Sequence, residues 1–121
     1  MSCHILIVDD HRGLRQALQL TLKEAGYRVT AAVNGRQALD VVEVDPPDVL
    51  LTDIRMPVMS GTELRDRLLA LGITIPVIVM SQDPDGAGIA AAHRADAYLA
   101  KPFDPTSLLA TVARVAACPG A

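Results

Sequence analysis

Residues 5–10 are Ile5-Leu6-Ile7-Val8-Asp9-Asp10, an unbroken apolar run that ends in two adjacent acids. Two later stretches, Val49-Leu50-Leu51 and Val77-Ile78-Val79-Met80, are also continuously apolar. Such runs are typical of strands buried on both faces, as in a parallel sheet covered by helices. Residues 28–33 alternate polar and apolar, and the apolar run at residues 97–100 is short. We therefore expect these last two segments to be the edge strands of the sheet.

Helical patterns separate the candidate strands. Apolar positions within residues 14–25 form a stripe on one side of a helix, which Gly26 can end in a left-handed turn. Asn34 is predicted to cap a second helix, and Asp104 followed by Pro105 is a typical start for the last one. Strand and helix thus alternate five times, with strands beginning near residues 4, 28, 48, 75 and 96. This order predicts an α/β fold with right-handed crossovers and a doubly wound sheet.

Length and composition limit the classes of function. The 121 residues fit one domain, with an ordered core at about residues 4–117 and a tail or linker start at residues 118–121. The chain is 50% hydrophobic and 21% charged, which is a globular composition. It has no Trp, and its 14 acidic and 11 basic residues give a net charge of −3. The basic residues are scattered and the only aromatic residues are two Tyr and one Phe, so we expect no direct nucleic-acid partner.

The cysteines and the apolar runs bear on location. Cys3 and Cys118 match no metal-ligand spacing and suggest no disulfide framework, so we interpret them as reduced thiols. The N-terminal residues do not resemble a signal peptide, and no apolar run approaches the length of a membrane span. We therefore expect a cytoplasmic protein without a membrane partner.

Polar residues follow four of the predicted strands. Asp9 and Asp10 come after the first, Asp53 after the third, Ser81 after the fourth and Lys101 after the fifth. Each alone is ordinary, because acids cap helices, serines occur in loops and lysines are usually solvated. Together they point to one site, since ligands bind beyond the carboxyl ends of the strands in open α/β sheets. Clustered carboxylates repel one another and need a cation, and an oxygen-only ligand set favours Mg²⁺.

From about Ile5 to the final helix, the sequence resembles the response-regulator receiver family of two-component signalling. The resemblance rests on Val8-Asp9-Asp10, Asp53-Ile54-Arg55-Met56-Pro57-Val58-Met59-Ser60-Gly61, Ser81 and Tyr98-Leu99-Ala100-Lys101-Pro102-Phe103. The acid followed by Met-Pro, Met and Gly is the most specific of these motifs. The resemblance implies a flavodoxin-like, five-stranded parallel sheet in the order 2-1-3-4-5 with helices on both faces.

The resemblance also implies roles for individual residues. Asp53 would accept a phosphoryl group from a sensor histidine kinase, with Ser81 and Lys101 as its catalytic partners on the phosphoryl group. Mg²⁺ would be bound by Asp9, Asp10, Asp53 and the backbone carbonyl of Arg55. Receivers of this kind are switches that catalyse only their own phosphorylation and dephosphorylation.

Two further features follow from the same resemblance. Ser81 and Tyr98 stand at the switch positions, so phosphorylation would alter the face formed by the fourth helix, fifth strand and fifth helix. The Lys101–Pro102 bond is expected to be cis. A downstream effector or output domain is implied, but its identity, the kinase and the signal are not specified, and a phosphorylation-linked homodimer is left open.

The sequence departs from the family pattern near the predicted site. Gln82 follows Ser81 where a small residue is usual, and Arg94 stands where many members have glycine. The fourth helix should be short, because Pro84 and the nearby glycines are poor helix formers; only residues 89–93 look convincingly helical. Arg55 adds a cation close to the acceptor, with an effect on the lifetime of the phosphoryl group that the sequence does not define.

Two other functions compete with this interpretation. A phosphatase of the haloacid-dehalogenase type also uses an aspartyl phosphate and Mg²⁺, but that family has Asp-x-Asp after its first strand, whereas Asp9 and Asp10 are adjacent. A receiver-like binding module that works without phosphorylation is the second alternative, although all the expected side chains are present. Whether the chain is a complete regulator or part of a longer protein is left open.

Overall fold

Each strand of the molecule is followed by one helix. The computed structural model describes residues 3–116, and within them the order is as follows: β1 (His4–Val8), α1 (Arg12–Glu24), β2 (Arg28–Ala32), α2 (Gly35–Val44), β3 (Val49–Asp53), α3 (Gly61–Ala70), β4 (Val77–Ser81), α4 (Gly86–Ala92), β5 (Ala97–Ala100) and α5 (Pro105–Ala116). The five predicted strands are all present, and each begins within about two residues of its predicted start.

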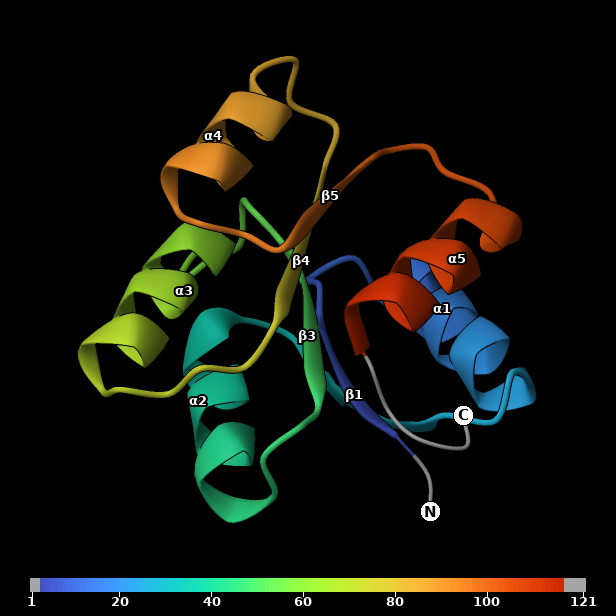
Figure 1. Cartoon of the computed structure of the whole chain (residues 1–121), viewed down its shortest axis with the longest axis horizontal. Helices are drawn as coiled ribbons and strands as arrows, with labels where there is room; N and C mark the ends of the chain where they lie inside the picture. Colours follow the sequence, from blue (N-terminus) through green and yellow to red (C-terminus); the bar gives the residue numbers. More distant parts are fainter. Residues whose placement is uncertain (1–2, 117–121) are drawn as a thin grey trace.

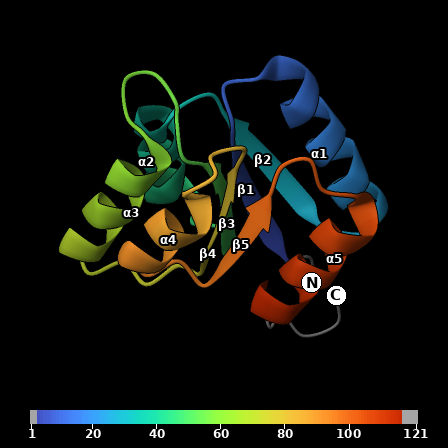
Figure 2. The same ribbon diagram turned by 90° about the horizontal axis from the view of Figure 1, so that it is seen from above.

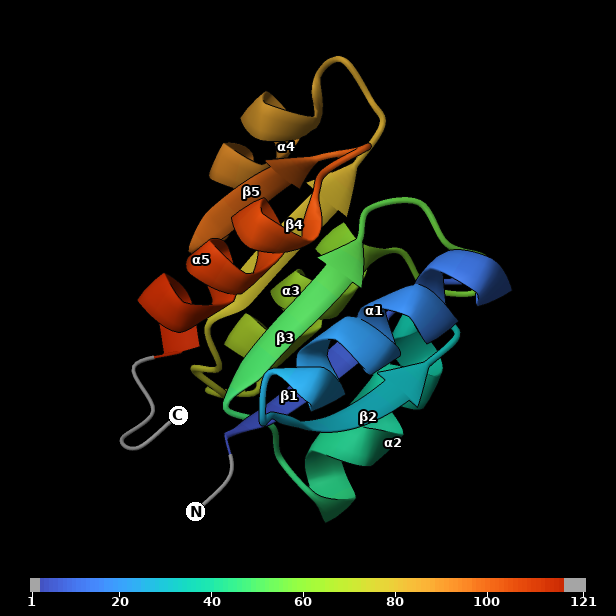
Figure 3. The same cartoon turned by 90° about the vertical axis from the view of Figure 1, so that its right-hand side faces the viewer.

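The strands form one parallel sheet in the order β2-β1-β3-β4-β5. Figure 3 shows the strand arrows pointing the same way, with their carboxyl ends along one edge. The predicted order 2-1-3-4-5 is thus confirmed, and β2 and β5 are the edge strands as expected. Parallel pairing requires a crossover between neighbouring strands, which the helices provide.

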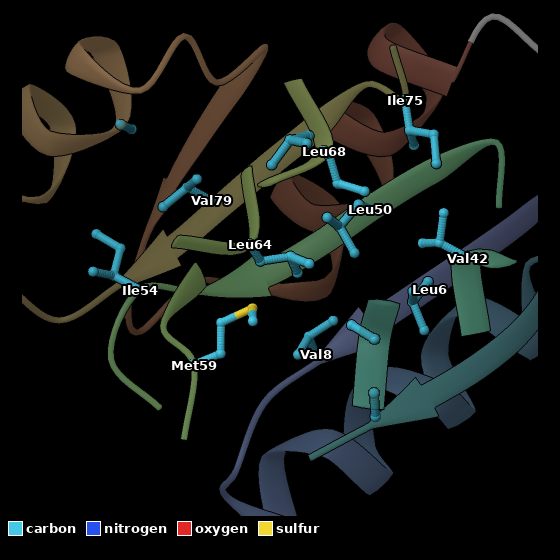
Figure 4. Close-up of a cluster of buried hydrophobic side chains, with 14 residues drawn as sticks. Leu6, Val8, Val42, Leu50, Ile54, Met59, Leu64, Leu68, Ile75 and Val79 are labelled. Atoms are coloured by element: carbon cyan, nitrogen blue, oxygen red, sulfur yellow. The ribbon is translucent and has the colours of Figure 1, made fainter. Parts of the chain in front are cut away.

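Helices cover both faces of the sheet. α1 and α5 lie on one face, and α2, α3 and α4 lie on the other (Figures 1 and 2). Successive residues of a strand point to opposite faces, so β1 sends Leu6 and Val8 into one hydrophobic cluster and Ile5 and Ile7 into the other. Figure 4 shows the cluster under α2, α3 and α4. Both clusters need apolar side chains, which explains the unbroken apolar runs of the central strands.

Turn and cap residues mark the ends of helices where the sequence predicts: Gly26 ends α1, and Asn34 and Asp104 begin α2 and α5. Gly26 has a φ of 98° after α1, a left-handed conformation that glycine adopts without a steric penalty. Asn34 caps α2 by accepting a hydrogen bond from the Gln37 backbone N–H at 2.9 Å. At the start of α5, Asp104 accepts a hydrogen bond from the Ser107 backbone N–H at 2.7 Å.

α4 is short, as predicted, but it begins three residues earlier than the prediction. It runs from Gly86 to Ala92, because Gly86 is buried against the Tyr98 ring and its N–H donates to the Asp83 carbonyl, which outweighs the poor helix propensity of the glycines. Arg94 follows the helix with a φ of 58°. This left-handed conformation explains why glycine is common at that position, and here an arginine adopts it.

Two observations bear on the predicted location of the protein: the state of Cys3 and the length of the apolar helices. Cys3 is buried and disulfide-bonded, so the prediction of a reduced thiol is wrong for this residue. Cys118 and the predicted tail at residues 118–121 lie outside the described residues. Among residues 3–116, no helix combines the length and the apolar character needed to cross a membrane. The cytoplasmic location stays a prediction, and Cys3 no longer supports it.

Candidate phosphoryl and metal site

Four strands bring the polar residues to one edge of the sheet. Asp9 follows the last residue of β1, Asp53 and Ser81 end β3 and β4, and Lys101 follows the last residue of β5. Parallel registers align these ends, since Val8 pairs with Thr52, Asp53 with Met80 and Ser81 with Ala100. Residues separated by up to 92 positions in the sequence therefore meet, which is the arrangement predicted from the strand ends.

Three carboxylates form a cluster at this edge. One oxygen each of Asp9, Asp10 and Asp53 lie within 4.8 Å of one another, with Asp9 buried, Asp53 partly buried and Asp10 exposed. Oxygen atoms at this spacing suit a hard divalent cation such as Mg²⁺, which takes carboxylate ligands and keeps several waters. The donor set offers no sulfur or imidazole for a softer metal. The residues present therefore fit the predicted ion.

Lys101 connects two of these carboxylates. Its Nζ donates to Asp9 Oδ2 at 3.0 Å and to Asp53 Oδ2 at 2.9 Å, and its side chain is only 10% exposed. Burial alone would lower the pKa of Lys101, but the hydrogen bonds to Asp53 and Asp9 outweigh this effect and raise the pKa above its usual 10.5. The ammonium is therefore charged at neutral pH and partly neutralises the cluster.

Backbone donors orient the same carboxylates. Asp9 Oδ1 accepts a hydrogen bond from the His11 N–H at 2.8 Å, and Asp53 Oδ1 accepts one from the Ile54 N–H at 2.7 Å. In each acid, one carboxylate oxygen thus accepts a hydrogen bond from a backbone N–H and the other accepts one from Lys101. Side chains that already have partners lose less conformational freedom when a ligand binds.

The motif after Asp53 forms a tight connection to α3. Ile54 and Met59 are buried in the core, and the Gly61 N–H donates to the Ile54 carbonyl at 2.8 Å. A Cβ at Gly61 would collide with the backbone carbonyl oxygen of Asp53. Glycine is therefore required because the start of α3 packs directly against the end of β3, a reason that the motif alone does not reveal.

Ser81 and Tyr98 also lie close together. The Ser81 hydroxyl is buried and accepts a hydrogen bond from the Asp83 N–H at 2.8 Å. The Tyr98 hydroxyl donates to the Ser81 carbonyl oxygen at 3.3 Å, and its ring lies against Gly86. Beside them, the Lys101–Pro102 peptide bond is cis, as the family resemblance implied.

A pocket opens at this edge of the sheet. It has a volume of about 460 Å³, and it is lined by Asp53, Arg55, Ser81, Gln82, Asp83, Pro84 and Lys101. The exposed side chain of Gln82, which stands where the family usually has a small residue, lines this pocket. Arg55 crosses to the neighbouring loop and forms an ion pair with Asp83.

Sequence reasoning missed Asp83 and Gly86. Asp83 contacts both Ser81 and Arg55, and Gly86 makes room for Tyr98. Both residues lie in a segment without a recognisable motif. Their roles depend on contacts with residues distant in the sequence, Arg55 for Asp83 and Tyr98 for Gly86. Only the proximity of Asp83 to Ser81 in the chain could have suggested one of them.

Comparison with known proteins agrees with this architecture. The model of the response regulator receiver domain family matches residues 5–113, so the chain belongs to this family. Receiver domains are signalling switches of two-component systems and not conventional enzymes.

Individual relatives are similar over most of the chain. The response regulator MprA of Mycolicibacterium vanbaalenii is 40% identical over 114 residues, which cover 91% of this chain and 48% of that protein. MprA of Mycobacterium tuberculosis H37Rv is also 40% identical over 114 residues, covering 91% of this chain and 49% of the relative. The chain thus spans about half the length of these curated relatives.

Solved structures share the fold. The chemotaxis protein CheY4 of Vibrio cholerae is 34% identical with a TM-score of 0.87, and the match covers 95% of this chain and 99% of that one. The signal receiver domain of a histidine kinase from Syntrophus aciditrophicus is 31% identical with a TM-score of 0.87, covering 95% and 90%.

Proposed function

We propose that this domain is a phosphorylation-dependent switch in which Asp53 accepts a phosphoryl group from a sensor histidine kinase in a Mg²⁺-dependent reaction. The observation that carries the proposal is the contact of one buried ammonium, Lys101 Nζ, with both Asp9 and Asp53 beside the third carboxylate of Asp10. Such an arrangement provides a nucleophile, ligands for a cation and a second positive charge, which are the parts that phosphoryl transfer requires.

In the proposed reaction, a carboxylate oxygen of Asp53 attacks phosphorus while the bond from phosphorus to the imidazole nitrogen breaks. That nitrogen keeps the electron pair of the broken bond. When bound, Mg²⁺ would supply charge neutralisation on the phosphoryl oxygens, and Asp9, Asp10, Asp53 and the Arg55 carbonyl would hold it. Lys101 would keep its contact with Asp9 and turn its other hydrogen bond toward a phosphoryl oxygen.

The Ser81 hydroxyl can donate a hydrogen bond to the phosphoryl group. Its hydroxyl oxygen already accepts from Asp83, so the hydroxyl hydrogen can donate to a phosphoryl oxygen without losing that bond. A shift of Ser81 would reach Tyr98 through the Ser81 carbonyl, to which the Tyr98 hydroxyl donates. Tyr98 lies on β5 beside α4, so we propose that the α4-β5-α5 face changes its partner preference.

Dephosphorylation would reverse the switch. A water molecule attacks phosphorus and the bond from phosphorus to the Asp53 oxygen breaks. The carboxylate is regenerated, and inorganic phosphate that contains the water oxygen is released. We propose that residues 1–121 act as one receiver domain, whose downstream partner is an effector protein or an output domain outside this chain. The match covers only about half of each curated relative, which supports an output domain as the partner.

Labelling with a small phosphodonor tests the proposal. The protein is incubated with acetyl phosphate and Mg²⁺, and intact mass spectrometry measures the fraction that carries one phosphoryl group. We expect a single modification that is absent in Asp53→Asn and after addition of EDTA, with circular dichroism unchanged. Asp40→Asn is the control, because Asp40 is an exposed carboxylate on α2. Equal labelling of Asp53→Asn and the wild type would contradict the proposal.

A further inference from the structure

The turn between β1 and α1 carries two of the three carboxylates of the cluster. Asp9 is buried, and its two carboxylate oxygens accept hydrogen bonds from the His11 N–H and from Lys101 Nζ. Asp10 is exposed, and within the described part of the chain its side chain has no hydrogen bond or ion pair. The position of Asp10 therefore depends on the backbone that leads to it.

Arg15 holds the peptide bond between these two acids. Its guanidinium Nη1 donates to the Asp9 carbonyl oxygen at 2.9 Å from the first turn of α1. The helix begins at the edge of the sheet where the strand arrows end (Figure 3). The Asp9 carbonyl and the Cα atoms of Asp9 and Asp10 lie in one plane, because the peptide bond is planar. A donor that fixes this carbonyl oxygen therefore limits the rotation of the plane that contains Asp10 Cα.

The start of α1 is an unfavourable place for a cation. Its first four residues include Arg12 and Arg15 and no acid. Positive side chains at the start of a helix oppose the helix dipole, so α1 gains no stability from either charge. Arg15 is nevertheless partly buried and bound to the Asp9 carbonyl, whereas Arg12 is exposed and has no hydrogen bond or ion pair among the described residues. The two arginines thus carry the same charge in the same turn, and only one of them contacts the acidic turn.

Resting on the Mg²⁺ site of the function proposed above, we infer that Arg15 is a positioning residue for the cation, because it holds the Asp9–Asp10 peptide in the orientation from which Asp10 presents its carboxylate. A guanidinium has no acceptor atom and is not itself a ligand for Mg²⁺. Its charge and its hydrogen bond have opposite effects on the affinity for Mg²⁺. Removal of a nearby positive charge alone would strengthen binding, whereas loss of a group that orients the ligands would weaken it. The sign of the change therefore separates the two effects.

The dissociation constant for Mg²⁺ measures the effect. Isotope-labelled wild type, Arg15→Met, Arg15→Lys and Arg12→Met are titrated with magnesium chloride at constant ionic strength, and the NMR shifts of the backbone amides give the constant for each. We expect Arg15→Met to bind Mg²⁺ about tenfold more weakly than the wild type, the range for loss of a partner that orients a metal ligand. Arg15→Lys keeps a donor on a long side chain and should fall between the two. Arg12→Met is the matched control, and it should bind Mg²⁺ at least as tightly as the wild type.

A spectroscopic signature separates positioning from a general loss of stability. The NMR shift of the Asp9 carbonyl carbon, measured without Mg²⁺, should change in Arg15→Met and stay constant in Arg12→Met, because Arg15 alone of the two donates to that carbonyl. Thermal unfolding without the ion gives the stability of each variant. A purely structural role for Arg15 would lower the thermal midpoint of Arg15→Met and leave its affinity for Mg²⁺ unchanged.

Three results would overturn the inference: equal affinity for Mg²⁺ in Arg15→Met and the wild type, tighter binding by Arg15→Met, or an equal loss of affinity in Arg12→Met. If Arg15→Met does not fold, Arg15→Gln takes its place with the same expectations. A wild-type protein whose spectrum shows no saturable response to Mg²⁺ would instead contradict the proposed function, so the two failures are distinguishable.

Discussion

Gly86 provides the space in which Tyr98 lies. A Cβ at this position would collide with the Tyr98 hydroxyl oxygen and lie 2.9 Å from two of its ring carbons. The hydroxyl meanwhile donates to the Ser81 carbonyl, at the end of the strand that carries the proposed phosphate contact. A single hydrogen atom in place of a side chain therefore permits the ring position from which Tyr98 reaches Ser81.

Replacing Gly86 with alanine should displace the Tyr98 ring from Ser81. The contact is too short to be tolerated, and the ring can move more easily than the backbone of α4. NMR spectra of tyrosine-labelled protein should show a changed environment for Tyr98 and little change for Tyr27. Gly88→Ala is the matched control in the same helix, because a Cβ there meets nothing within 4 Å. An unchanged Tyr98 signal in Gly86→Ala would refute this expectation.

At the scale of elements, the sequence predicts those helices and strands whose cause lies within one segment, and not those that depend on contacts with distant segments. The central strands and the caps at Asn34 and Asp104 could be predicted, because apolar runs and cap residues act within one segment. The early start of α4 could not, because it depends on the packing of Gly86 against Tyr98 of β5, which is distant in the sequence. That Asp9 and Asp53 lie close together could be predicted, because both stand at the carboxyl ends of strands. The contacts of Asp83 could not, because they depend on how the loops fold.

The cap of α5 should make stability depend on acidity. Hydrogen bonds from the Ser107 backbone and side chain hold the pKa of Asp104 below its usual 3.8. A lowered folded-state pKa means that the stabilisation is present above the unfolded value and is lost as the pH falls through the folded value. The advantage of wild type over Asp104→Asn in thermal midpoint should therefore shrink between about pH 6 and about pH 3.

A second substitution separates the charge of Asp104 from its capping oxygen. Asp104→Ala removes both and should unfold at a lower temperature than Asp104→Asn at neutral pH, since asparagine is also a good N-cap. A gap between wild type and Asp104→Asn that stays constant or widens on acidification would contradict the assignment.

At the scale of the whole molecule, the sheet concentrates negative charge at one end. If all three carboxylates of the cluster are ionised, their three negative charges and the one positive charge of Lys101 leave two negative charges in a small volume. This local repulsion opposes folding, and a divalent cation would remove it. The folded state brings these groups together, so the cation should bind it in preference to the unfolded chain.

Magnesium should therefore stabilise the fold. At about 100 times its dissociation constant, a ligand that binds only the folded state adds about 2.7 kcal/mol to the free energy of unfolding. Thermal unfolding in Mg²⁺ and in EDTA measures this difference, and the protein should stay folded in both. Asp10→Asn should reduce the stabilisation, while Asp40→Asn on α2 should retain it. An equal effect of Mg²⁺ on Asp10→Asn and on the wild type would argue against a cation at this cluster.

The contact of Lys101 with Asp9 joins the first strand to the segment that follows the last one. During synthesis, a chain that has emerged only as far as β4 already contains every acid of the cluster but lacks the ammonium that holds two of them. Such a nascent chain cannot assemble the constellation on which phosphorylation would depend. Under the proposed function, only molecules whose translation has passed residue 101 would be competent to take phosphate from a kinase.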